Sequence, residues 1–456
     1  MSETYDCVII GSGPGGYVAA IRAAQLGLNT AVVERSTALG GRCLHFACIP
    51  AKTVLRSADV LTELAAAQAL GIEVGEPTVD FGRIAERRSR VIQTLESGVS
   101  HLLKKNRITV ITGEAALDVN ADVIVGDRLL RATHAVILAV GSVRRAIPGI
   151  EFGGRIVGTE EAWALESLPE SMAVLGAGAS GAEVASAYAR LGCSVGLFEA
   201  ADRILPVEDS EISALVLAGL RSDGVDVRVA TQVSSVRDEG GRVSFEYDGT
   251  PASAEWLIVA AGRSPDVASL GLVEAGVELT ESGHVMVDRF QQTSVDRVYA
   301  IGDIVPGPAL AHKASGEGIV AVEHAAGNTV EPVRLVDVPR ATFCHPNVGS
   351  FGLTEEASIS SGHDVVVGRA KYGAVGAGEV YGEGGFVKIV ADRRDGEILG
   401  GHIVGARAAD LIQELVNVKA IEGGVAEVAR AIHSHPTLSE VIAEAARAAD
   451  GWMIHG

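Results

Sequence analysis

The first 34 residues alternate between apolar and flexible segments in a pattern that predicts one βαβ unit. An apolar run at 6–10 fits a buried strand, and a glycine-rich turn follows at 11–16. The Ala-rich segment 17–26 fits a helix that Gly27 ends, and residues 30–33 form a second apolar strand. The chain is therefore expected to begin as strand, turn, helix and strand.

The same pattern of apolar and glycine positions recurs further along the chain. An apolar strand is predicted at 172–175, a glycine turn at 176–181, a helix at 182–191 and a strand at 195–198. A repeat of this kind predicts two domains of one α/β class.

In both copies an acidic residue follows the first glycine by 23 positions, Glu34 after Gly11 and Glu199 after Gly176. Glycine permits a tight turn and lets the backbone approach a pyrophosphate at the helix N-terminus. The acid would accept hydrogen bonds from ribose hydroxyls, and Glu199 would repel a 2′-phosphate. Two dinucleotide sites are predicted, and the second is expected to prefer NAD(H) to NADP(H).

The segments around these two units also have patterns that predict helices and strands. A charged helical stretch is predicted at about 52–105, followed by a short strand region at 108–111. Apolar strands at 136–141 and 257–262 each end in glycine, and each is expected to close one domain. Another buried strand, at 298–303, ends in an acid.

The last third of the chain, after about Val336, has a different pattern. Residues 386–390 alternate as a strand does, and Ala-rich helices come late. Residues 373–385 are rich in glycine and are expected to form a loop. This part is predicted to be a separate α+β domain.

Composition narrows the class of protein. Lys and Arg total 38 against 58 for Asp and Glu, so the net charge of −20 argues against a nucleic-acid binder. The longest uncharged stretch, Cys7 to Ile21, has only 15 residues and predicts no membrane span. The N-terminus is acidic and unlike a signal peptide, so a cytoplasmic location is expected.

Cys43 and Cys48 are two of only five cysteines in the chain. They could be buried free thiols, a metal pair or a disulfide, although no second cysteine pair completes a zinc site, and no metal is predicted. Residues five apart in an ideal helix are too distant for a disulfide, so Cys43 is expected before the helix or on a distorted first turn. A redox pair is the favoured interpretation.

Two histidines, His433 and His435, precede Glu440 near the end of the chain. Such residues can form a general base oriented by an acid, or simply pack in the structure. Two nucleotide sites, a cysteine pair and a His–Glu pair together indicate electron transfer between a nicotinamide and thiols. A flavin is the natural relay between these two chemistries.

The chain resembles the pyridine nucleotide–disulfide oxidoreductases over nearly its whole length. The resemblance rests on GSGPGGYVAAIRAAQLG at 11–27, GPALAHKASGEG at 307–318 and HSHPTLSE at 433–440. It implies an α/β fold with two Rossmann-like dinucleotide-binding domains and a C-terminal α+β dimerisation domain. The implied division is FAD-binding at 1–148, NAD-binding at 149–267, FAD-binding or central at 268–335 and interface at 336–456.

The resemblance assigns binding roles to two sets of residues. FAD would be held by Gly11, Gly13, Gly15, Gly16, Glu34, Lys52, Gly141, Gly302, Asp303 and Ala311. NAD would be held by Gly176, Gly178, Gly181, Glu183, Glu199 and Gly262. Lys52 and Glu183 match a Lys–Glu pair near the flavin on its nicotinamide side.

The resemblance also implies a reaction, the oxidation of dihydrolipoyl groups to lipoyl with NAD⁺ as acceptor. Cys43 would exchange with lipoyl sulfur and Cys48 would lie next to the flavin. His435 would be the base and Glu440 its partner, both supplied by the other subunit of a homodimer. The substrate would be a lipoylated carrier of a 2-oxo acid dehydrogenase or glycine cleavage complex.

The cysteine segment departs from the family's usual GGTCLNxGCxPSK. The changed positions are Arg42, His45, Ala47 and Ala51, and Ser180 replaces an apolar residue in the second glycine turn. These changes motivate a second hypothesis, an NADH-dependent reductase of another disulfide or of a quinone. A third hypothesis is a flavoprotein scaffold or redox sensor without turnover.

Overall fold

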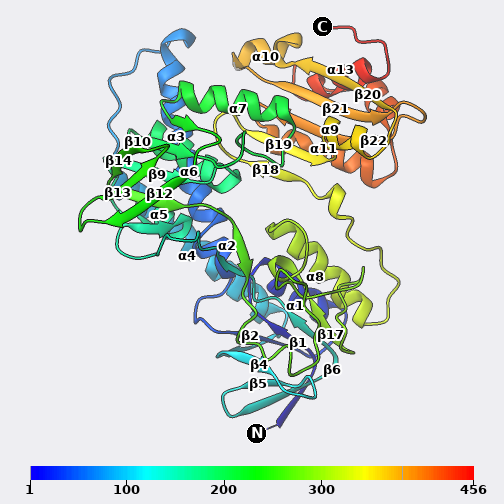
Figure 1. Cartoon of the computed structure of the whole chain (residues 1–456). Helices are drawn as coiled ribbons and strands as arrows, with labels where there is room; N and C mark the ends of the chain where they lie inside the picture. Colours follow the sequence, from blue (N-terminus) through cyan, green and yellow to red (C-terminus); the bar gives the residue numbers. More distant parts are fainter. Residues whose placement is uncertain (1, 383) are drawn as a thin grey trace. The chain divides into compact units, whose positions relative to one another are not determined.

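The computed structural model describes residues 2–382 and 384–456, which form two compact units built from discontinuous segments (Figure 1). Unit 1 comprises Met1–Thr53, Gly82–Arg145 and Gly262–Leu335, and unit 2 comprises Val54–Phe81, Ala146–Ala261 and Val336–Gly456. The predicted fold class is confirmed in both units. The predicted four-part division of the chain stays a prediction.

Unit 1 is built on a mainly parallel sheet of order β3-β2-β1-β6-β5-β4, with β17 paired to β6. Its strands are β1 (Ser2–Ile10), β2 (Thr30–Glu34), β3 (Thr109–Thr112), β4 (Ala115–Leu117), β5 (Val123–Val125), β6 (Arg128–Leu138) and β17 (Val298–Ala300). Successive residues of β1 enter different cores: Val8 and Ile10 pack on one side, Cys7 and Ile9 on the other. Burial on both faces explains the continuous apolar run in the sequence.

Two helices of unit 1 pack against each other: α1 (Pro14–Gln25) and α8 (Ala311–Ala325). A Cβ on Gly318 would lie 2.8 Å from the carbonyl oxygen of Gly15, so glycine at 318 lets the two helices approach this closely. A two-stranded ribbon of β7 (Ser142–Arg144) and β16 (Arg263–Pro265) completes the region, with the 3₁₀ turn η2 (Gly302–Ile304) after β17.

The predicted helical stretch at 52–105 is wrong as one continuous feature. The structure has α3 (Cys48–Ala66), a short 3₁₀ turn η1 (Ala67–Leu70) and then α4 (Phe81–Lys105). Gly71 adopts φ +79° and ends η1 in the left-handed region that favours glycine.

Unit 2 contains the second predicted βαβ unit. Its parallel sheet has the order β11-β10-β9-β15-β8. The strands are β8 (Ile156–Gly158), β9 (Ser171–Leu175), β10 (Ser194–Phe198), β11 (Asp226–Arg228) and β15 (Trp256–Val259), with helices α5 (Thr159–Ala164), α6 (Ala179–Arg190) and α7 (Ser210–Ser222). An antiparallel sheet accompanies it, formed by β12 (Val233–Asp238), β13 (Val243–Tyr247) and β14 (Thr250–Ala254).

The end of the chain adds an antiparallel sheet of order β18-β19-β22-β21-β20 to unit 2. The strands are β18 (Arg340–Thr342), β19 (Val348–Gly352), β20 (Val365–Lys371), β21 (Phe386–Asp392) and β22 (Ile398–Val404). Helices α9 (Glu355–Ser360), α11 (Ala408–Ala420), α12 (Val425–Arg430) and α13 (Glu440–Ala449) belong to the same region. The predicted α+β character is confirmed.

The predicted loop at 373–385 is wrong in part. It contains a 3₁₀ turn η4 (Tyr372–Ala374) and a short helix α10 (Gly376–Tyr381), while residue 383 lies outside the described residues. Gly378 packs so closely on Tyr372 that a Cβ there would collide with the Tyr372 carbonyl. Glycine here therefore permits close packing of a helix. None of the helices in the described residues is long and apolar enough to cross a membrane.

Candidate functional site

The first glycine cluster forms a cradle between β1 and α1. Gly11 follows β1 with φ +105°, and a Cβ there would collide with the carbonyl oxygen of Ala139. A Cβ on Gly16 would collide with the Gly11 carbonyl, whereas Gly13 faces open space at the helix N-terminus. A side chain at Gly13 would occupy the space where a phosphate can meet the free helix amides.

Glu34 ends β2 beside this cradle, with 9% of its surface exposed. Its Oε2 accepts hydrogen bonds from the Ser12 amide at 2.9 Å and the Ser12 hydroxyl at 2.7 Å. The carboxylate is thus fixed at the C-terminal edge of the sheet, next to the glycine turn, where an adenosine ribose is expected in this fold.

The second cradle repeats these contacts in unit 2. Gly176 has φ +101°, and a Cβ on Gly181 would collide with the Gly176 carbonyl, while Gly178 again faces open space. Glu199 accepts a hydrogen bond from the Ala177 amide at 2.6 Å, as Glu34 does from Ser12. Both cradles therefore fit a dinucleotide. The assignment of FAD to the first cradle and NAD to the second stays a prediction.

Asp303 lies in η2 directly after Gly302, which has φ +78°. The Ser142 hydroxyl donates a hydrogen bond to Asp303, and Arg263 Nε donates to that hydroxyl at 2.7 Å. Sequence reasoning did not identify Ser142 and Arg263. Their positions in the sequence could have indicated them, because they directly follow Gly141 and Gly262, the glycines that end the two matching apolar strands.

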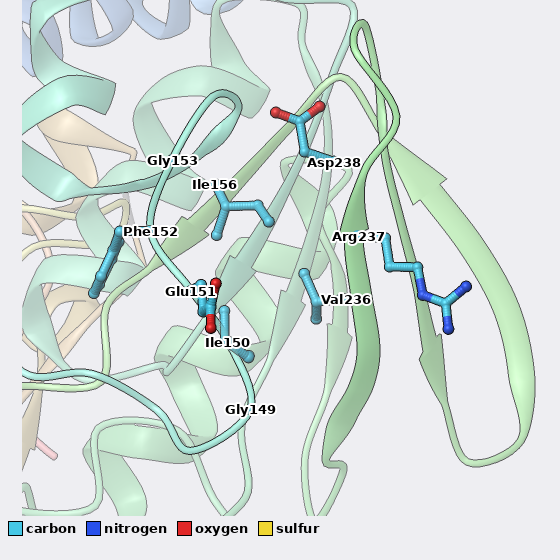
Figure 2. A pocket seen from close by; sticks show the side chains of 9 residues that line it. All are labelled: Gly149, Ile150, Glu151, Phe152, Gly153, Ile156, Val236, Arg237 and Asp238. Atoms are coloured by element: carbon cyan, nitrogen blue, oxygen red, sulfur yellow. The ribbon is translucent and has the colours of Figure 1, made fainter.

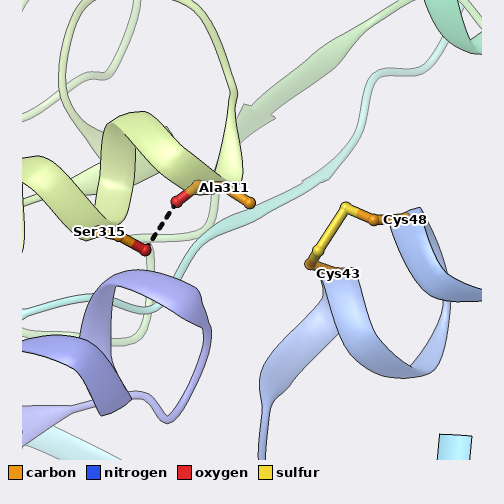
Figure 3. The surroundings of a disulfide bond; sticks show 4 residues. All are labelled: Cys43, Cys48, Ala311 and Ser315. Carbon is orange, nitrogen blue, oxygen red and sulfur yellow. Dashed lines mark hydrogen bonds between the residues drawn. A yellow bond between two sulfur atoms is a disulfide. The ribbon is translucent and has the colours of Figure 1, made fainter. Parts of the chain in front are cut away.

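Cys43 and Cys48 form a disulfide in unit 1 with Cα atoms 4.8 Å apart (Figure 3). The expectation that Cys43 lies before the helix is confirmed, because Cys43 lies in the separate short helix α2 (Gly41–His45) and Cys48 begins α3. The chain turns at Phe46, whose amide bonds to the Arg42 carbonyl at 2.8 Å. Cys48 thus lies at a helix N-terminus, which stabilises a thiolate.

Figure 3 draws this disulfide together with the first turn of α8, which Ala311 begins. The Ser315 hydroxyl donates to the Ala311 carbonyl at 3.1 Å and to the Pro14 carbonyl at 3.2 Å. The start of α8 is thereby tied to the start of α1, beside the first cradle.

Lys52 and Glu183, the predicted pair, lie in different units. Lys52 stands one turn after Cys48 on α3 in unit 1. Glu183 is buried in α6 of unit 2, where it accepts a hydrogen bond from the Phe343 amide at 2.9 Å. Their predicted cooperation stays a prediction.

His435 and Glu440 form a hydrogen-bonded dyad at the start of α13, which Glu440 begins, with Nδ1 and Oε1 2.9 Å apart. The His435 side chain is 75% exposed, so its Nε2 is accessible. Burial raises the pKa of Glu440, but hydrogen bonds from the Thr437 amide and His435 outweigh it and hold the pKa below the ordinary value. Glu440 is therefore an ionised carboxylate that orients the imidazole.

His433 has a different environment. Its Nε2 lies 2.6 Å from Glu414 and its Nδ1 lies 3.1 Å from the Ala431 carbonyl, so both ring nitrogens are engaged. The hydrogen bond that His433 donates to the Glu414 carboxylate raises the pKa of His433. This geometry favours His435 as the base.

A recess in unit 2 is lined by residues 149–153, Ile156 and 236–238 (Figure 2). Asp238 there accepts a hydrogen bond from the Arg155 amide at 2.8 Å. None of the predicted site residues lines this recess.

Comparisons with known proteins agree with this geometry. The model of the pyridine nucleotide-disulphide oxidoreductase family matches residues 5–318, and that of its dimerisation domain matches residues 338–446. The chain belongs to the pyridine nucleotide-disulphide oxidoreductase family. It is a flavoprotein oxidoreductase that uses FAD and NAD(H) with a redox-active disulfide, as predicted.

Among individual relatives, the chain is 41% identical to a dihydrolipoyl dehydrogenase of Bacillus subtilis, over the whole of both chains. It is also 41% identical to a dihydrolipoyl dehydrogenase of Mycobacterium tuberculosis, with 99% of each chain covered.

Two solved structures are similar in fold. LpdA from Mycobacterium tuberculosis aligns with a TM-score of 0.90 at 26% identity, covering 97% of this chain and 99% of that one. The HOCl-induced flavoprotein disulfide reductase RclA of Escherichia coli, in its Cu(II) complex, aligns with a TM-score of 0.87 at 26% identity and the same coverage. The match to the dimerisation domain supports homodimer formation.

Proposed function

We propose that the protein oxidises dihydrolipoyl groups to lipoyl groups with NAD⁺ as the final acceptor. The observation that carries this proposal is the His435–Glu440 dyad in a chain that also holds the Cys43–Cys48 disulfide at a helix start. The full-length similarity to dihydrolipoyl dehydrogenases supports the choice of substrate.

The chain's own residues perform a thiol–disulfide exchange. A lipoyl thiolate attacks the sulfur of Cys43, which breaks the Cys43–Cys48 bond and releases Cys48 as a thiolate. The second lipoyl thiol gives its proton to His435 of the partner subunit and attacks the mixed disulfide, which frees Cys43 and closes the lipoyl ring. Glu34, Asp303 and the first cradle would hold FAD, which would supply a two-electron acceptor for the reduced Cys43–Cys48 pair and a hydride donor for NAD⁺.

The second cradle would hold NAD⁺, with Glu199 on the adenosine ribose. Its carboxylate would repel a 2′-phosphate, so NADP⁺ is the poorer acceptor. Lys52 and Glu183 would act near the flavin on the nicotinamide side. A lipoylated carrier protein would be the physiological partner.

The direct test is anaerobic turnover of dihydrolipoamide by the purified protein, with NAD⁺ and NADP⁺ compared as acceptors. We expect NADH formation that depends on dihydrolipoamide and is clearly faster than NADPH formation. Reduction of a quinone or another disulfide by NADH, with no lipoyl turnover, would instead support the hypothesis of a reductase with a different substrate.

The dyad is proposed to serve the disulfide of the partner subunit, and a hybrid dimer tests this directly. We expect co-expressed Cys43→Ser and His435→Gln chains, isolated as a mixed dimer with two affinity tags, to recover about half of the wild-type rate. One of the two sites then combines an intact disulfide from one chain with an intact histidine from the other. A mixed dimer as inactive as either parent would show that each site lies within a single chain.

A further inference from the structure

A buried ion pair lies on α8, outside the residues that the proposed chemistry uses. Lys313 Nζ and Glu317 Oε1 are 2.9 Å apart on successive turns of the helix. The two side chains are 0% and 1% exposed. Removing both charges from water is costly and offsets much of their mutual attraction, so the pair contributes little net stability.

Both members of the pair bind the backbone of the same residue, Gly302. Lys313 Nζ donates to the Gly302 carbonyl at 3.0 Å, and the Gly302 amide donates to Glu317 Oε2 at 2.7 Å. The pair thus holds both hydrogen-bonding groups of the residue that precedes Asp303. Gly302 has φ +78°, a conformation that this clamp keeps in place.

The same helix also contacts the first glycine cradle. Ser315 bonds to the Pro14 carbonyl, and Gly318 packs against the Gly15 carbonyl. Helix α8 therefore touches both chain segments that would contact FAD: the first turn of α1, beside which it lies in Figure 1, and the turn η2 that carries Asp303. A shift of α8 would disturb both segments together.

We propose that Lys313 and Glu317 are positioning residues for FAD, fixing the backbone of Gly302 and with it the Asp303 carboxylate and the start of α1. The inference rests on the proposed assignment of Asp303 and the first cradle to FAD. The pair does not touch the reacting atoms, and its effect passes through Gly302.

The test is the rate of FAD release from the diluted full-length holoenzyme, followed by the rise in free-flavin fluorescence. Lys313→Met removes the bond to the Gly302 carbonyl and leaves Glu317 unpaired, so we expect release about tenfold faster than from the wild type. Glu317→Gln keeps an oxygen for the Gly302 amide and should speed release by only about threefold. This milder variant keeps the test valid if Lys313→Met does not retain FAD.

A matched control is available in unit 2. Lys388 forms an equally buried pair with Asp209, at 2.9 Å and with exposures of 2% and 1%. Lys388→Met should lower the unfolding temperature, followed by far-UV circular dichroism, yet leave the FAD release rate unchanged. Release at the wild-type rate from both α8 variants, or equally fast release from the control, would overturn the inference.

This readout involves no lipoyl substrate. If the protein failed to oxidise dihydrolipoamide, the proposed function would fall while the FAD measurement still decided the role of the pair. If the wild type held no FAD, the cofactor assignment itself would be wrong.

Discussion

Replacing Cys43 by Ser is expected to lower the rate of dihydrolipoamide oxidation by at least about 10³-fold, the scale on which losing a covalent catalytic group acts. The hydroxyl cannot form the mixed disulfide, so substrate electrons have no entry into the protein. NADH oxidation by an artificial small-molecule acceptor requires only the two nucleotide sites and should persist. Steady-state assays with both substrate pairs measure the two effects in one preparation.

The matched control for this variant is Cys193→Ser. Cys193 is buried, and burial, together with Glu255, raises the pKa of its thiol to about 12, so it does not react as a thiolate. Its replacement should leave lipoyl turnover near the wild-type rate. Substantial turnover by the Cys43→Ser protein would contradict the proposed exchange at the disulfide.

Replacing His435 by Gln is expected to lower dihydrolipoamide oxidation by about 10²- to 10⁴-fold, the usual loss when a general base is removed. Glutamine can still accept or donate a hydrogen bond near Glu440, but it cannot take the thiol proton. Proton transfer to a base makes wild-type turnover depend on pH, and this dependence should be weaker in the variant. A pH–rate profile of both proteins measures the difference.

His433→Gln provides the comparison two residues away. Because both ring nitrogens of His433 bond within the chain, its loss should change turnover by no more than about threefold and act mainly on stability. The pKa of His433 is raised by Glu414, so the stability from this pair is complete at low pH and is lost as pH rises through the raised pKa. A larger loss of activity in this variant than in His435→Gln would reverse the assignment of the base.

Local patterns were enough to predict both βαβ units. Each depends on a short apolar strand, a glycine turn and an acid at a fixed distance, all within one stretch of chain. Glu34 and Glu199 therefore lie where the spacing indicated, each bonded to the amide after the first glycine of its turn.

Structural features were missed where a high glycine content wrongly indicated a loop, or where the feature depends on contacts between residues distant in sequence. The helix α10 was missed because its glycines serve close packing on Tyr372 rather than a turn. The bond from Ser142 to Asp303 joins residues 161 positions apart, which no local pattern reveals. The separate helix around Cys43 likewise depends on how the chain turns at Phe46.

The discontinuity of unit 1 has a consequence for the order in which a newly synthesised chain can fold. All strands of the parallel sheet of unit 2 lie between Ile156 and Val259. They are therefore synthesised before β17, which the sheet of unit 1 needs for its completion. Strand β6 can pair with β17 only after Val298 has been synthesised, and the Gly302–Asp303 turn is synthesised later still. Capture of the flavin is accordingly expected as a late event in biosynthesis, after the second nucleotide fold is already complete.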